Sequence, residues 1–303
     1  MKPKFNAMKK TENGRRFLTR IGRSLAVGLV LFAVARANAA HELMYAIELS
    51  TGNLISLNSD APGTILASRA VSGLQSSESI RGIDMGPDGV LYALGSSSRL
   101  YTLNPATGQA TAVGGQFSTL LNGSTFGVTV GPTGLRVTSD LGQALLVNTS
   151  TGAATVQSSP AYAAGDPHAG VTPRIDALAF QASSGTWIAG DSLANLFANF
   201  TPSTGILNTI GNAGIDFSRN NGLDFSQITG ILYLASPAAS SDPAANLYTV
   251  NPATGAVTLV GLIGNPGDNI LVNGLTGAGV PEPGSLALLA LGGALFAIVR
   301  RKK

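Results

Sequence analysis

Cysteine is absent from the 303 residues, and charged side chains make up only 12% of them. Without cysteine the chain has no disulfide, no thiolate nucleophile and no zinc–thiolate site. Its two histidines, His41 and His168, are too far apart to form a short metal-binding motif. Catalytic serine elbows, zinc-protease helices, phosphate loops and EF-hand patterns are also missing. We therefore expect no cofactor and no bound metal.

Lysine is missing from the long central part of the chain. Between residues 40 and 283, six arginines stand against fifteen acidic residues, a net charge of −9. The other basic residues lie near the two ends, between Lys2 and Arg36 and at residues 300–303. Nucleic acid binding needs cations that neutralise phosphates, so this acidic body excludes a nucleic acid partner. With 44% hydrophobic residues, the body can bury a large core without disulfides.

The N-terminus predicts a secretory signal peptide over residues 1–39. A basic leader from Lys2 to Arg23 precedes the apolar run Ser24–Ala35, and Ala37–Ala40 supplies an Ala-x-Ala site for signal peptidase, with cleavage after Ala39. A membrane anchor is the alternative, but the run is shorter than the roughly 20 residues that a span needs. The pair Arg15-Arg16 hints at twin-arginine export, although its spacing from the apolar residues favours the general secretion route.

The C-terminus has three ordered elements. A Val-Pro-Glu-Pro motif is followed by the apolar run Leu286–Val299 and by a basic end, the motif and the first two basic residues being Val280, Pro281, Glu282, Pro283, Arg300 and Arg301. The run predicts a short transmembrane helix whose basic end stays cytoplasmic, hence transient anchoring in the inner membrane. An ordinary single-span anchor after a proline-rich linker is the alternative.

These residues 280–303 resemble the PEP-CTERM sorting signal of exopolysaccharide-producing Gram-negative bacteria. The resemblance implies that an exosortase recognises Pro281, Glu282 and Pro283 and that the tail is then removed. It also implies that the exported protein reaches the cell envelope, the outer surface or the extracellular matrix.

The body between the two ends repeats one motif. Val90–Gly115 and Ile231–Gly261 align, sharing the turn Asn-Pro-Ala-Thr-Gly, and three weaker copies accompany them. Their turn glycines are separated by 45, 44, 53 and 50 residues and are Gly63, Gly108, Gly152, Gly205 and Gly255. Several short strands recurring with a period of 40–50 residues predict a β-propeller.

A further strand precedes each copy except the first. These strands have a small residue where innermost strands crowd an axis, namely Gly82, Gly127, Ala177 and Gly222. The missing strand is found at the other end, in Val272–Ala278, with Gly274 at the small position. The sequence therefore predicts an all-β, five-bladed β-propeller over residues 40–279, closed by its C-terminal strand so that no sheet edge stays open.

The body is also similar to a domain-of-unknown-function family, number 4394. The best-matching stretches are Gly127–Val156 and Tyr162–Phe180. This chain departs from the usual pattern in the first stretch, where it has Val-Thr-Val-Gly in place of Asp-Phe-Asn-Pro, and at His168, where asparagine is usual. The resemblance supports the fold and supplies no function.

Candidate ligand-binding residues are expected on the face whose loops lead into the innermost strands. The longest such loop, Ser158–Arg174, suggests a lid and contains an Asp-x-His pair. Polar groups at equivalent strand starts could line a mouth that binds a sugar or an ion, and the candidates are Arg81, Asp176, Asn221, Asn273, Asp166 and His168. Alternatively these groups cap strand ends and bond to backbone.

Asp84 and Asp224 occupy equivalent positions further along their strands, where Thr129 and Thr276 stand in others. Paired carboxylates around a propeller axis are what a glycosidase requires. The alternative is that both aspartates form turns. We expect an exported propeller that binds an exopolysaccharide or envelope protein without catalysis. The rivals are a carbohydrate hydrolase or lyase, and a structural surface protein without a ligand.

Overall fold

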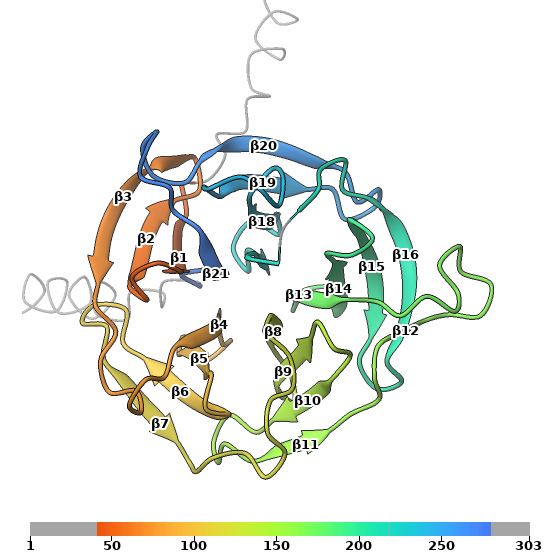
Figure 1. Ribbon diagram of the computed structural model, residues 1–303, viewed down its shortest axis with the longest axis horizontal. Coiled ribbons are helices and arrows are strands. Elements are labelled where there is room, and N and C mark those ends of the chain that lie inside the picture. Colours follow the sequence, from red (N-terminus) through yellow and green to blue (C-terminus); the bar gives the residue numbers. More distant parts are fainter. Residues whose placement is uncertain (1–40, 218, 280–303) are drawn as a thin grey trace, which may run out of the picture. The chain divides into compact units, whose positions relative to one another are not determined.

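A computed structural model describes residues 41–217 and 219–279, which form twenty-one strands in five sheets around a central axis (Figure 1). The predicted five-bladed β-propeller is confirmed. The described residues include no helix long and apolar enough to cross a membrane. The predicted signal peptide, Pro-Glu-Pro motif and apolar tail lie outside the described residues.

Each blade has four strands in order from the axis outward. Blade 1 consists of β21 (Val272–Gly277), β1 (Leu43–Glu48), β2 (Leu54–Asn58) and β3 (Ala61–Arg69). Blade 2 consists of β4 (Ile80–Met85), β5 (Leu91–Gly95), β6 (Arg99–Leu103) and β7 (Ala110–Val113). Blade 3 consists of β8 (Phe126–Gly131), β9 (Gly134–Ser139), β10 (Ala144–Val147) and β11 (Ala154–Val156).

The last two blades follow the same plan with one addition. Blade 4 consists of β13 (Ile175–Gln181), β14 (Thr186–Asp191), β15 (Leu196–Thr201) and β16 (Ile206–Asn212), and β12 (Ala161–Tyr162) pairs in parallel with the outer edge of β16. Blade 5 consists of β17 (Gly222–Phe225), β18 (Leu232–Ser236), β19 (Asn246–Val250) and β20 (Val257–Leu262). Apolar side chains buried between adjacent blades form the core.

The Asn-Pro-Ala-Thr-Gly turn connects the third and fourth strands of blades 2 and 5. In blade 2 the Asn104 side-chain oxygen accepts hydrogen bonds from the backbone N–H groups of Ala106 and Thr107. The turn then closes through Gly108, whose φ of 77° favours glycine. The repeat is therefore conserved in chemistry as well as in sequence within this chain.

The first copy of the repeat departs from the predicted alignment. Gly63 lies inside β3 and not in a turn, because blade 1 connects β2 to β3 through the two residues Ser59 and Asp60. The equivalence of Gly63 with the other turn glycines was therefore wrong. The error arose because the inner strand of this blade comes from the far end of the chain, which obscures where its repeat begins.

The C-terminal strand closes the ring. Five residues of β21 pair with β1, from Met44 opposite Gly277 to Glu48 opposite Val272, and the Ala278 N–H donates to the Leu43 carbonyl. Small residues let neighbouring inner strands approach: a Cβ on Gly82 would lie 2.6 Å from Val128 Cγ2, and one on Gly127 would lie 3.0 Å from the Ala177 backbone. The small-residue positions and the closure by Val272–Ala278 are thus confirmed.

Candidate functional site

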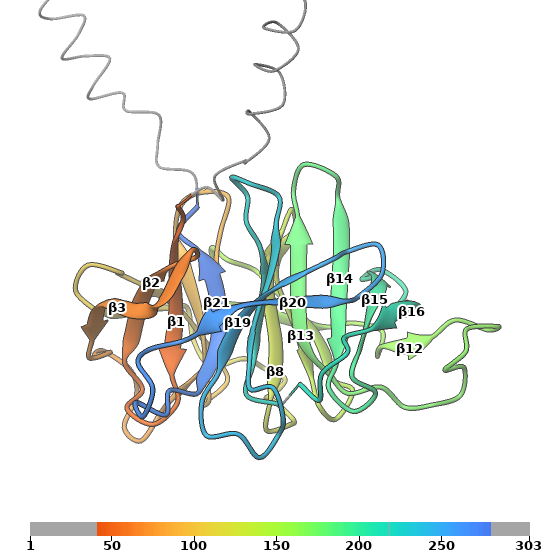
Figure 2. The ribbon, with the colours of Figure 1, turned by 90° about the horizontal axis from the view of Figure 1, so that it is seen from above.

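All five innermost strands run in the same direction along the axis, so the ring has two distinct faces. We call the face where they begin the bottom face and the face where they end the top face (Figure 2). The candidates from the strand starts belong to the bottom face. Asp84, Asp224 and Thr276 lie near the strand ends and belong to the top face.

On the bottom face, Asp176 and Asn221 are neighbours. The Asn221 amide donates to Asp176 Oδ1 at 3.4 Å, and the hydroxyls of Ser192 and Thr125 donate to Asp176 Oδ2 at 2.7 and 3.2 Å. Burial raises the pKa of Asp176 to about 7, although these hydrogen bonds oppose the rise. The carboxyl group thus joins the ends of three inner-blade segments by hydrogen bonds, as the alternative interpretation of these residues requires.

Little space is open beside these two side chains. Asp176 and Asn221 line an axial opening of about 10 Å³, enough for about one water molecule. Arg81 and Asn273 are half-buried and do not line this opening. The structure therefore brings Asp176 and Asn221 together but does not place them in a cavity of ligand size.

Asp166 and His168 lie at the periphery, away from the axis. Their loop is attached to the outer edge of blade 4, where β12 pairs with β16 (Figure 1). Asp166 accepts hydrogen bonds from the Thr209 N–H at 2.7 Å and its hydroxyl at 2.8 Å. The His168 ring packs on Tyr162 with centroids 5.3 Å apart. These contacts hold the loop against its own blade, and they lower the pKa of Asp166 despite some desolvation.

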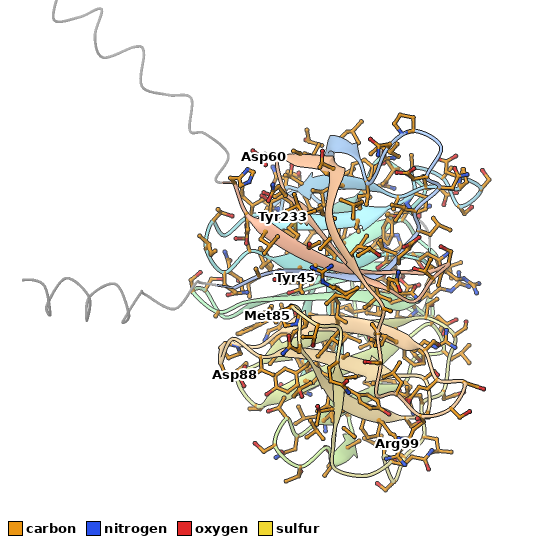
Figure 3. All side chains as sticks on the ribbon, turned by 90° about the vertical axis from the view of Figure 1, so that its left-hand side faces the viewer. Tyr45, Asp60, Met85, Asp88, Arg99 and Tyr233 are labelled. Atoms are coloured by element: carbon orange, nitrogen blue, oxygen red, sulfur yellow. The ribbon has the colours of Figure 1, made fainter. Side chains whose placement is uncertain are left out.

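The top face contains a cavity of about 430 Å³ centred on the ends of the innermost strands. Its walls include Phe180 and Phe225 together with Pro87, Pro132 and Met85, and two aspartates, Asp84 and Asp224, line its interior. Figure 3 shows Met85 and Asp88 toward the same end of the propeller as Asp60. We refer to this space as the top cavity and to the two aspartates as the axial pair.

One hydroxyl joins the axial pair. Thr276 Oγ1 lies 3.1 Å from Asp84 Oδ1 and 3.1 Å from Asp224 Oδ2, so the two carboxyl oxygens are no further apart than twice that distance. The Val130 N–H and the Thr129 hydroxyl donate to Asp84 Oδ2, and the Gly277 N–H donates to Asp224 Oδ2. The pair therefore links four innermost strands. Asp84 is not a turn residue, since Asp88 accepts the turn's Val90 N–H.

Counting protons indicates that the pair retains a shared proton as long as no cation lies beside it. Thr276 Oγ1 already accepts the Met85 N–H at 3.0 Å and has a single proton to donate. It can therefore donate to only one carboxylate, and its other contact is favourable only if that carboxyl is protonated. Burial raises the pKa of Asp84 to about 6. Burial, followed by the charge of Asp84, also raises the pKa of Asp224.

Glu42 is a third acid beside the pair, which the sequence analysis did not identify. It is only 3% exposed, and neither carboxyl oxygen has a hydrogen-bond partner among the described residues. Desolvation by burial raises its pKa. Its charge in turn raises the pKa of Asp224. No pattern marks Glu42, since it precedes the first strand and follows the predicted signal peptide.

The described residues hold no group of three or more histidine, aspartate or glutamate side chains placed to bind a metal ion. The three acids also take no part in the ion pairs formed within the described part of the chain. The top cavity thus combines apolar walls with carboxyl groups that have no cationic partner there.

Comparison with solved structures finds matches of low sequence identity. A nidogen/laminin complex chain has a TM-score of 0.45 and 12% identity, covering 79% of this chain and 98% of that one. The glutaminyl cyclase of Myxococcus xanthus has a TM-score of 0.45 and 12% identity, covering 70% and 83%. A protein of unknown function from Bacteroides caccae has a TM-score of 0.40 and 11% identity, covering 74% and 73%.

No curated protein matches the sequence. Residues 279–303 match the PEP-CTERM protein-sorting motif, which marks an exported protein of the cell envelope that an exosortase processes. Residues 53–276, the greater part of the propeller, match the model of a domain of unknown function (DUF4394). The chain belongs to this DUF4394 family and ends in a PEP-CTERM sorting motif.

Proposed function

We propose that the mature propeller is a binding protein of the cell surface or extracellular matrix that holds a segment of polysaccharide in the top cavity. The observation that carries the proposal is the cavity itself. Its volume of about 430 Å³ lies within the range of small-molecule sites. Phenylalanine and proline walls suit the apolar faces of sugar rings, and carboxyl oxygens accept hydrogen bonds from sugar hydroxyls.

The geometry favours a polysaccharide over a protein partner. A stable protein interface needs roughly 800 Å² on each partner, whereas a concave site of this size suits a small or chain-like ligand. The bottom face, where the sequence pattern suggested binding, offers less support. Its best-connected candidates, Asp176 and Asn221, bond to each other beside a space of about one water molecule.

Hydrolysis by the axial pair is less well supported than binding. A glycosidase needs one carboxyl to donate a proton and another to reach the sugar or a water molecule. Both oxygens of Asp84 are already engaged, by Thr276, Thr129 and the Val130 N–H. Only Asp224 keeps an oxygen, Oδ1, without a partner among the described residues. One available carboxyl suits recognition better than two-carboxylate chemistry.

The sorting tail accounts for where binding takes place. The predicted span Leu286–Val299 would anchor the exported chain briefly in the inner membrane, and cleavage near Pro281–Pro283 would free the propeller. The proposal therefore involves signal peptidase and an exosortase as processing partners, and an exopolysaccharide as the ligand of the processed protein.

Expression in matched hosts with and without an exosortase tests the location and supplies the processed protein. We expect intact mass to show loss of both ends, and the body to reach the surface or medium fraction, only when the enzyme is present. Purified exopolysaccharide from the exosortase-bearing host should then bind the processed protein. Phe180→Ala, a change at a half-buried wall residue, should weaken that binding, whereas Phe200→Ala, a buried change in β15 of blade 4 away from the top cavity, should not. Binding unaffected by Phe180→Ala would exclude the top cavity as the site.

A further inference from the structure

The top cavity contains one acceptor oxygen that the fold itself does not use. Asp224 is 5% exposed and lines the cavity, and its Oδ2 receives the Gly277 N–H and contacts Thr276. Its Oδ1 has no hydrogen-bond partner among the described residues. A carboxyl oxygen on a buried residue that is open to a cavity and has no partner in the fold is available to a ligand.

The charge around this oxygen is of one sign. Asp84 faces Asp224 from β4 through the Thr276 hydroxyl, and Glu42 lies behind it beside Gly277. From β8 and β21 the groups facing the pair are the uncharged hydroxyls of Thr129 and Thr276. Burial raises the pKa of Tyr233, and the charge of the nearby Glu42 adds to that rise, so Tyr233 stays neutral and supplies no cation. Hence, among the described residues, no positive group packed around the pair balances the acids, and a cationic ligand would balance them.

The shape of the site selects the kind of cation. Calcium requires six to eight oxygen ligands, and the axial pair offers only one that is not already bonded within the described residues. An ammonium group needs far fewer acceptors, since it has three N–H donors, and it also interacts favourably with an aromatic face such as that of the half-buried Phe180, which lines the cavity.

We propose that the top cavity recognises the protonated amine of an amino sugar, with the ammonium group bound to Asp224 in exchange for the proton that the axial pair shares. In the empty cavity one proton compensates the two carboxyl groups. When the ammonium group binds, its positive charge replaces that of the proton beside the two carboxyl groups, and the proton is released to solvent. This inference rests on the proposed saccharide-binding function of the same cavity.

The exchange has a measurable pH dependence. Burial raises the pKa of Asp84 to about 6 and raises the pKa of Asp224 as well, so at low pH the site keeps its protons, which compete against the amine. As pH rises toward about 7, the proton is held less tightly and affinity for the amine should increase. The increase should stop when the ligand's own amine begins to lose its proton.

Calorimetry with two matched oligosaccharides tests the inference on the full-length protein. The probes are the β-1,4-linked tetramer of glucosamine and its fully N-acetylated counterpart, which lacks the positive charges. We expect the amine tetramer to bind about tenfold or more tightly than the acetylated one, a typical effect of a desolvated charge contact. Titrations at pH 6 in buffers of different ionisation enthalpy should report release of about one proton per site.

Variants then locate the contact. Asp224→Asn keeps the side-chain shape and should remove the preference for the amine while leaving affinity for the acetylated tetramer within about twofold. Glu48→Gln, a matched acid-to-amide change at the far end of β1, should alter neither affinity. The two wild-type titrations need no variant, so they decide the question even if Asp224→Asn does not fold.

The outcomes separate this inference from the proposed function. If the acetylated tetramer binds as tightly as the amine tetramer and no proton is released, amine recognition is refuted while saccharide binding stands. If neither tetramer binds up to millimolar concentration, amine recognition fails, and the proposed function fails with it when the exopolysaccharide also does not bind. If Asn273→Ala abolishes amine binding and Asp224→Asn does not, the site is on the bottom face and the inference is overturned.

Discussion

Replacing Gly274 by alanine should weaken the closure of the ring by a calculable amount. Gly274 lies in β21 with a φ of 76°, and a Cβ there would lie 2.8 Å from the Ile83 backbone nitrogen of β4. The left-handed conformation costs a non-glycine residue about 1–2 kcal/mol. Crowding against backbone adds about 1–3 kcal/mol, so we expect Gly274→Ala to lower the free energy of unfolding by about 2–5 kcal/mol.

Gly142→Ala is the matched control. Gly142 has a φ of 77°, but a Cβ there would meet nothing within 4 Å. Gly142→Ala should lower the free energy of unfolding only by the cost of the left-handed backbone conformation, about 1–2 kcal/mol. Urea unfolding followed by circular dichroism measures both variants. Equal losses would show that the inner strands can separate at no cost, and the argument that small residues are needed around the axis would be refuted.

Three further predictions concern individual hydrogen-bonded groups. Thr276→Val should lower the free energy of unfolding by about 1–3 kcal/mol, because the Met85 N–H loses its buried acceptor, whereas the exposed Thr258→Val should change little in the same urea titration. Asp176 is protonated more readily in the folded protein, where its pKa is raised to about 7, so its stabilising effect is complete below about pH 4 and lost as pH rises through 7. The free energy of unfolding should fall across this window and fall less in Asp176→Asn; an unchanged slope in the variant would assign the dependence to other groups. Asp166→Ala should free the loop of residues 158–174 from Thr209, and limited proteolysis followed by mass spectrometry should find new cleavage there, with no other region gaining a cut.

The architecture was predictable because its determinants are local and repeated. Four of the five blades connect their third and fourth strands through a turn that closes on a glycine with positive φ, such as Gly108, and each inner strand has a small residue at the axis. These features depend on residues a few positions apart, so they can be recognised in the amino-acid sequence alone. Even the closure by Val272–Ala278 followed from counting strands. Only the alignment of the first copy failed, where the blade is assembled from both ends of the body.

The candidate site was less predictable because its contacts are distant in sequence. Thr276 Oγ1 and Asp84 Oδ1 are 192 residues apart along the chain, and Glu42 reaches the same place from the opposite end of the body. The alignment of the repeats did place four residues at the same height along the propeller axis, namely Asp84, Asp224, Thr129 and Thr276. It did not show that a hydroxyl joins the two acids or that a cavity opens beside them. Those facts depend on how five sheets converge on one axis.

Because β21 is the last strand of the body to be exported, the propeller can be completed only at the end of export. Translocation from the N-terminus delivers β1 long before β21. The edge of β1 that pairs with β21 therefore has no hydrogen-bond partner until the last part of the body emerges. Ala278 still bonds to Leu43, and the sorting motif begins immediately afterwards at residue 280. A sorting cut only a few residues earlier would remove part of β21 and reopen the ring. The distance between motif and strand therefore sets how precisely the sorting enzyme must cut for an intact propeller to be released.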